Sequence, residues 1–199
     1  MIEFCKGYLY AFDSDVVDNK KLYNRCHEIE SILKTSYPNT EAGWYGTFSS
    51  ANHDKYNLFG FPDVQLSKLY QLMVKNISPL LDNESYVIKS WMNLYRAGQK
   101  VDWHGHWPER FRVWHGFYCV NVGESATHYR IPKIKDTIVV PSKEGRLVIG
   151  KSAGDTHAST EWTDTSTNRI TLAFDIIPIS TLLPHDDKRF DHFYPFKVV

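Results

Sequence analysis

The chain has 199 residues, of which 42% are hydrophobic, 15% aromatic and 23% charged. This length and composition predict one domain with a sizeable core, and the aromatic content favours a β-rich fold. The formal net charge is zero, with 23 basic and 23 acidic residues and no basic run, so nucleic-acid binding driven by phosphate neutralisation is not expected.

The cysteines and the hydropathy pattern bear on the cellular setting. Cys5, Cys26 and Cys119 are widely spaced and form no CxxC pair, which favours a reducing cytoplasm over a disulfide framework. Residues 1–12 lack the basic and apolar regions of a signal peptide, and no stretch reaches the ~20 apolar residues of a membrane span. We therefore expect a cytoplasmic protein without a membrane partner.

The first 84 residues are predicted to supply strands and two supporting helices. Residues 1–12 alternate loosely and predict a first strand, and residues 44–49 predict a short one. A helix is expected over 18–34, because Asp18 can cap it and apolar residues recur on one face. A second helix is expected to begin at Pro62-Asp63 and to end at Ser78-Pro79.

From residue 85 the pattern changes to short strands separated by Gly and Pro turn signals. Helices followed by strands predict an α+β, mainly β fold, an antiparallel sandwich or barrel with helices on one outer face. We expect a single domain over 1–199, with N-terminal strands and helices over 1–84, a β core over 85–178 and an irregular tail over 179–199. Strands are predicted over 86–96, 113–122, 127–131, 137–140, 146–149 and 168–178.

The segment WMNLYRAGQKVDWHGH, residues 91–106, ends in the most informative motif. His104 and His106 are two residues apart, so in extended backbone their side chains point to the same face, where two imidazoles can bind one metal ion. Two polar residues on a loop rim are the plainer alternative. His115, just before Gly116, is expected at the rim or in packing contacts.

A second group of candidate residues follows in the C-terminal part. His157 lies after the strand predicted over 146–149. Alternation in RITLAFD, residues 169–175, puts Arg169, Thr171 and Asp175 on one face and apolar residues on the other. If the apolar face packs on the helices, Arg169 points inward, where it requires an anion. Asp175 or Glu161 can serve, and a bound dicarboxylate would match the planar guanidinium.

The order of these motifs resembles the Fe(II)/2-oxoglutarate-dependent oxygenases over residues 85–178. That family has a double-stranded β-helix (jelly-roll) fold, an HxD/E…H iron triad and an Arg-x-Ser/Thr pair that holds 2-oxoglutarate. The resemblance implies a dioxygenase, by default a hydroxylase, that uses Fe(II), molecular oxygen and 2-oxoglutarate and releases succinate. It implies iron ligation by His104 and His157, and 2-oxoglutarate binding by Arg169 and Thr171, with Tyr95 and Asn93 nearby.

Position 106 departs from the family, which has Asp or Glu where this chain has His. Three interpretations follow: His106 completes a three-histidine site, which we prefer; a carboxylate from Asp102, Glu109 or Asp155 completes it; or the protein is a non-catalytic binding module. A three-histidine cupin-type dioxygenase that needs no 2-oxoglutarate is a further alternative, but it gives Arg169 no role. The substrate is expected to be a small molecule or a peptide.

Overall fold

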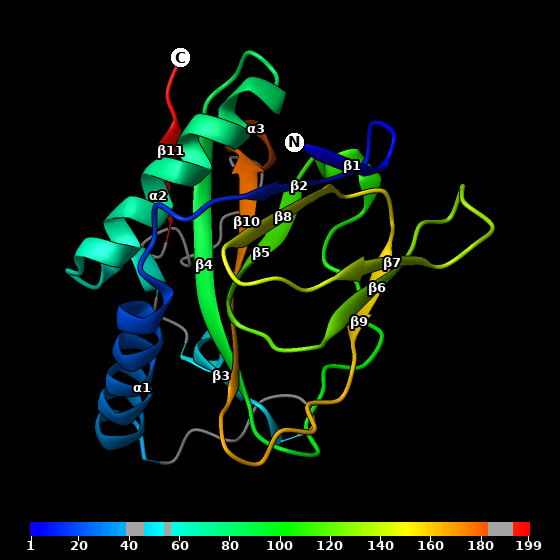
Figure 1. Ribbon diagram of the computed structural model, residues 1–199. Helices are drawn as coiled ribbons and strands as arrows, with labels where there is room; N and C mark the ends of the chain where they lie inside the picture. Colours follow the sequence, from blue (N-terminus) through cyan, green and yellow to red (C-terminus); the bar gives the residue numbers. More distant parts are fainter. Residues whose placement is uncertain (39–45, 54–56, 183–192) are drawn as a thin grey trace.

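The computed structural model describes residues 1–38, 46–53, 57–182 and 193–199, which form two antiparallel sheets with helices on one side (Figure 1). The larger sheet has eight strands among these residues. Its order is β1 (Ile2–Cys5), β2 (Leu9–Asp13), β8 (Arg146–Lys151), β5 (Trp114–Asn121), β10 (Arg169–Pro178), β4 (Tyr86–Tyr95) and β11 (Tyr194–Lys197), with β3 (Phe48–Ser49) also paired to β4.

The smaller sheet faces the larger one and has the order β7 (Ile138–Pro141), β6 (Ala126–Arg130) and β9 (Thr156–Ser159). The backbone of His104 lies beside β9 and forms an isolated antiparallel bridge with His157. The two sheets together make a jelly roll, which confirms the predicted fold class. None of the described helices is long and apolar enough to span a bilayer.

The two predicted helices cover the outer face of the larger sheet (Figure 1). Helix α1 (Asn19–Ser36) begins after Asp18, whose carboxylate accepts the Lys21 N–H. Helix α2 (Val64–Ile77) begins after Asp63, which accepts two backbone N–H groups of its first turn. Their apolar faces and the outer face of the sheet form the larger hydrophobic core, so each helix is held by its cap and by burial of one face.

Strand β10 lies between β5 and β4 and carries a different chemistry on each face. Ile170, Leu172, Phe174 and Ile176 belong to the core beneath the helices, whereas Arg169, Thr171, Ala173 and Asp175 line a cavity between the sheets. A smaller apolar cluster closes the space between the sheets, with Leu9, Phe117, Tyr129 and Val148 among its members. The alternation predicted for this segment is therefore confirmed.

Three local expectations differ from the structure. Residues 1–12 form a hairpin of β1 and β2 rather than one strand, because Gly7 takes a positive φ of 76° between them. His157 lies on the short strand β9, which was not predicted. The tail is not irregular where it is described: it contains α3 (Ile179–Leu182) and β11, which pairs with β4. Trp44 and Tyr45 of the predicted strand over 44–49 lie outside the described residues.

Candidate metal and co-substrate site

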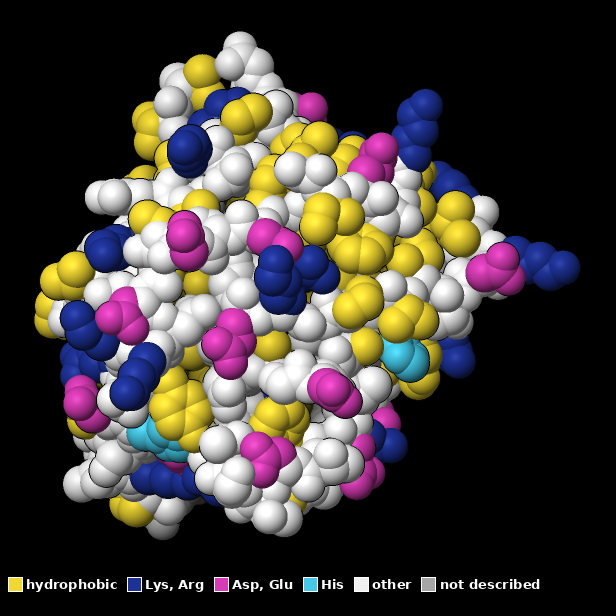
Figure 2. Space-filling model, viewed as in Figure 1, with side chains coloured by type: hydrophobic (Ala, Val, Ile, Leu, Met, Phe, Trp, Pro, Cys, Tyr) yellow, Lys and Arg dark blue, Asp and Glu magenta, His cyan; other side chains and the backbone are white. Residues whose placement is uncertain are grey.

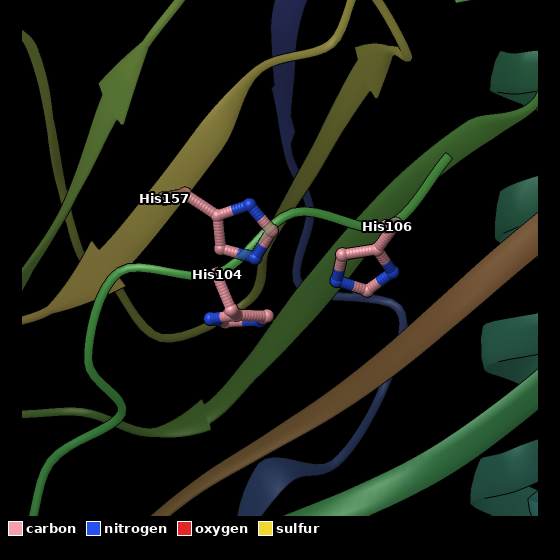
Figure 3. A group of neighbouring side chains, drawn as sticks. All are labelled: His104, His106 and His157. Atoms are coloured by element: carbon pink, nitrogen blue, oxygen red, sulfur yellow. The ribbon is translucent and has the colours of Figure 1, made fainter. Parts of the chain in front are cut away.

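The three predicted histidines converge between the two sheets (Figure 3). The backbones of His104 and His157 exchange two hydrogen bonds of 3.1 and 2.9 Å, which fixes the loop carrying His104 against β9. His106 follows two residues later on the same side, so one ring nitrogen from each of the three histidines lies within 4.8 Å of the other two. This separation allows one metal ion to contact all three rings.

The hydrogen bonds of the rings determine which nitrogens are available to a metal. His104 Nδ1 lies 2.8 Å from the Asp102 carbonyl, and His106 Nδ1 lies 2.9 Å from Asp175 Oδ1. Because both partners only accept, each Nδ1 carries the hydrogen, and a neutral ring then has a lone pair on Nε2. His106 Nε2 and His157 Nδ1 are buried without a partner among the described residues, an arrangement that costs about 1–3 kcal/mol per group unless a ligand occupies the site.

The protonation of the rings follows from burial and from charge. Burial, followed by the neighbouring histidines, lowers the pKa of His157 well below its ordinary value, and burial also lowers the pKa of His104. Burial alone would lower the pKa of His106 as well, but the Asp175 carboxylate outweighs it and raises that pKa. The rings of His104 and His157 are therefore neutral at pH 7, so that each can offer a lone pair to a metal ion, and the ring of His106 is hydrogen-bonded to the buried Asp175 carboxylate.

Of the three carboxylates considered as alternatives to His106, one lies at the site. Asp102 and Glu109 form ion pairs with Lys100 and Lys133, and neither belongs to a potential metal group among the described residues.

Asp155, in contrast, is buried and belongs to a second potential donor group with His115 and His157. Its Oδ2 lies 3.1 Å from His115 Nε2, and its Oδ1 accepts the Ala153 N–H at 3.1 Å. Both carboxylate oxygens thus have protein donors, whereas His106 Nε2 has none among the described residues. The geometry favours His104, His106 and His157 as the donor set.

The predicted co-substrate residues line the same cavity of about 390 Å³. Arg169 is only 1% exposed, its Nε donates to Ser125 Oγ at 3.2 Å, and its guanidinium lies 4.6 Å from the centroid of the Tyr95 ring. Its Nη1 is buried with no partner among the described residues. Thr171 and Asn93 face each other in the β10–β4 register and also line the cavity. A buried guanidinium with an unused donor suits a carboxylate ligand.

Of the two places expected for His115, the structure shows the packed one: it is 2% exposed, and its ring stacks on His106 and His157 with centroids 4.9 and 5.3 Å away. Asp175 does not serve Arg169: it accepts from His106 and, through Oδ2, from Trp107 Nε1 at 3.0 Å. Glu161 does not line the cavity. The alternation of residues 169–175 already indicated that Asp175 faces inward, but its partner comes from a distant loop.

Comparison with known proteins rests on structure. No family model matches the sequence, and no curated protein sequence matches it. The chain is similar to a prolyl hydroxylase from Trichoplax adhaerens in complex with a hypoxia inducible factor peptide, with a TM-score of 0.60, 9% identity and coverage of 92% of this chain and 89% of that one. A Pseudomonas putida prolyl-4-hydroxylase matches with a TM-score of 0.56, 11% identity and coverage of 85% and 92%.

A third similar structure is a non-heme alpha ketoglutarate dependent epimerase, SnoN, from nogalamycin biosynthesis. It matches with a TM-score of 0.55, 9% identity and coverage of 85% of this chain and 76% of that one. The identities are low, so these likenesses concern the fold. The chain has the fold of the Fe(II)/2-oxoglutarate oxygenases, the superfamily that its motif order resembles.

Proposed function

We propose that this chain is an Fe(II)- and 2-oxoglutarate-dependent oxygenase that hydroxylates its substrate. The observation that carries the proposal is a set of unsatisfied buried groups in one cavity. His106 Nε2, His157 Nδ1 and Arg169 Nη1 have no partner among the described residues. The imidazole nitrogens can bind a metal ion, and the guanidinium can bind an anion.

The residues fit the cofactors that the fold implies. His104, His106 and His157 would hold the iron, since neutral imidazoles are good ligands for Fe(II). Arg169 and Thr171 would hold the distal carboxylate of 2-oxoglutarate, with Tyr95 and Asn93 beside them. With both bound, iron and 2-oxoglutarate supply an oxidation in which O₂ is split, one oxygen entering the substrate and the other succinate, with release of CO₂.

The chain's own contribution is orientation and exclusion of water. Arg169 is fixed by Ser125 and by the Tyr95 ring, so its free donor is already aimed before the co-substrate arrives. The smaller sheet and the aromatic side chains of Trp91 and Trp107 enclose the histidines, which lowers the local dielectric and strengthens each charge interaction.

The substrate class is proposed to be a small molecule or a peptide. The similar structures include a prolyl hydroxylase with a peptide and an epimerase from nogalamycin biosynthesis. On the face in Figure 2, Lys and Arg are interspersed with Asp and Glu, in keeping with the zero net charge. This mixed surface supports small or peptide substrates over nucleic acid. The three free cysteines support a cytoplasmic setting.

The test is an anaerobic titration of Fe(II) and 2-oxoglutarate into the purified chain, followed through the weak visible charge-transfer absorption of the ternary complex. We expect the absorption in the wild type and its loss in Arg169→Ala. Arg146→Ala is the control, because this arginine pairs with Asp13 away from the cavity. Absence of the absorption in the wild type contradicts the proposal. Its persistence in Arg169→Ala would mean that 2-oxoglutarate binds without this guanidinium, which contradicts the proposed role of Arg169.

A further inference from the structure

Position 106 carries an imidazole and no carboxylate. In the family that the sequence resembles, this position bears a metal-binding Asp or Glu, and here it bears His. Yet a buried carboxylate, Asp175, lies 2.9 Å from the ring of this histidine and comes from the neighbouring strand β10. The site therefore still contains a carboxylate, but the His106 imidazole ring separates it from the donor nitrogens.

The contacts of Asp175 leave little freedom to this arrangement. The residue is 8% exposed, with one oxygen on His106 Nδ1 and the other on Trp107 Nε1 at 3.0 Å. The His106 ring also stacks against the Trp91 indole, with centroids 5.8 Å apart and planes inclined by 24°. The ring is therefore fixed in position and tautomer, and its Nε2 is left buried without a partner among the described residues.

We propose that Asp175 is a positioning residue that acts through His106 to make this three-histidine site a strong metal site. This rests on the proposed function. Three neutral imidazoles alone leave the full charge of a divalent ion in a buried cavity, which is costly. A carboxylate that accepts the Nδ1 hydrogen fixes the ring and increases the basicity of Nε2, and loss of such a partner weakens metal binding roughly 10- to 100-fold.

The test is an anaerobic titration with Co(II), which reports on the ligands through its visible absorption. Asp175→Asn keeps the shape and removes the charge, so we expect Co(II) to bind roughly 10- to 100-fold more weakly. Asp155→Asn is the matched control, since this buried carboxylate contacts His115 instead of a proposed ligand. We expect it to change the affinity by less than about threefold, within the context dependence of such contacts.

A double-mutant cycle separates positioning from a general structural role. If Asp175 acts through His106, then Asp175→Asn has no further effect on Co(II) affinity in a His106→Ala background. The same loss in both backgrounds overturns the inference. So does a result in which Asp155→Asn weakens binding and Asp175→Asn does not, which would assign the metal to His115, Asp155 and His157.

Two further outcomes keep the test decisive. If Asp175→Asn does not fold, Trp107→Phe still removes the second donor to the carboxylate. That variant should weaken Co(II) binding several-fold only when His106 is present, and an unchanged affinity overturns the inference. A wild-type chain that binds no Co(II) contradicts the proposed function itself, whereas wild-type binding with an unaffected Asp175→Asn contradicts only the inference.

Discussion

The most unusual single residue is Arg169, a guanidinium almost wholly buried and paired with no carboxylate among the described residues. The Ser125 hydroxyl and the Tyr95 ring offset part of the cost of burying its charge. The remaining cost of burying this charge lowers the stability of the ligand-free protein, and a bound anion would offset it. Stability sacrificed in this way is typical of a binding site.

This reasoning predicts that Arg169→Met, which replaces the charge with an apolar chain of similar length, stabilises the ligand-free protein. A gain of about 1 kcal/mol would raise Tm by about 2–4 °C in a chain of this size. Thermal unfolding without metal or 2-oxoglutarate measures it, and calorimetric titration should show 2-oxoglutarate binding lost.

Arg146→Met is the matched control, because Arg146 is also mostly buried but pairs with Asp13. Its replacement should lower Tm. Equal destabilisation by both substitutions would mean that Arg169 is held by contacts within the protein and is not reserved for an anion.

At the scale of elements, β4, β5 and β10 could be predicted because their alternation or apolar runs are long enough to recognise. Strand β9 has only four residues between a turn and a polar segment, so its hydrogen bonds with β6 and with the backbone of His104 define it more than its sequence does. The alternation of residues 169–175 indicates that Asp175 faces inward, but its contact with His106, and that of His115, could not be predicted, because both depend on how the sheets stack.

Strand β11 could not be predicted either, because the sequence around it is rich in proline and charged residues. In the structure it pairs with the edge of β4, and Phe196 is 5% exposed against the Tyr70 ring. We predict that Phe196→Ala lowers the free energy of unfolding by about 3 kcal/mol, because it leaves a cavity beside α2. Urea unfolding measures the loss.

Val198→Ala is the control for this prediction, since Val198 is 78% exposed just beyond the strand. Its substitution should change the free energy of unfolding by less than about 0.5 kcal/mol. Similar small effects for both residues would show that the tail contributes nothing to the sheet in solution.

The pairing of β2 with β8 gives a prediction about pH. Asp13 faces Arg146 in the register and accepts two hydrogen bonds from it. These hydrogen bonds are the main reason why the pKa of Asp13 falls to about 2. Since the folded pKa lies below the unfolded value, the pair stabilises the protein fully above about pH 4, and the contribution disappears as pH falls towards 2.

Asp13→Asn should therefore cost about 1 kcal/mol at pH 7, a figure reduced for the partial exposure of the pair. The difference between wild type and variant in urea unfolding should shrink between pH 4 and pH 2. A difference that stays constant over this range would assign the effect to packing and not to the charge.

At the scale of the whole molecule, the site and the larger core lie on opposite faces of the same sheet. The core beneath α1 and α2 contains none of the proposed ligands, so burial alone should keep the chain folded when the metal is removed. Arg169 lies on the other face of this sheet, and the histidines approach it from the smaller sheet and the adjoining loop, so that they line one cavity and leave buried groups without partners among the described residues. Ligands should therefore add to the stability of a fold that already exists.

This separation of the site from the core can be tested by removing and adding the ligands. Chelator treatment should leave the far-ultraviolet circular dichroism unchanged. Co(II) and 2-oxoglutarate, both at about 100 times their Kd, should each add about 2.7 kcal/mol to the free energy of unfolding by mass action. For a chain of this size that corresponds to a rise in Tm of about 5–10 °C per ligand. In Arg169→Met the Co(II) increment should remain and the 2-oxoglutarate increment should vanish, because only the second ligand needs the guanidinium. Loss of both increments in that variant would mean that metal binding also depends on Arg169. Unfolding by chelator would mean that the fold depends on the metal.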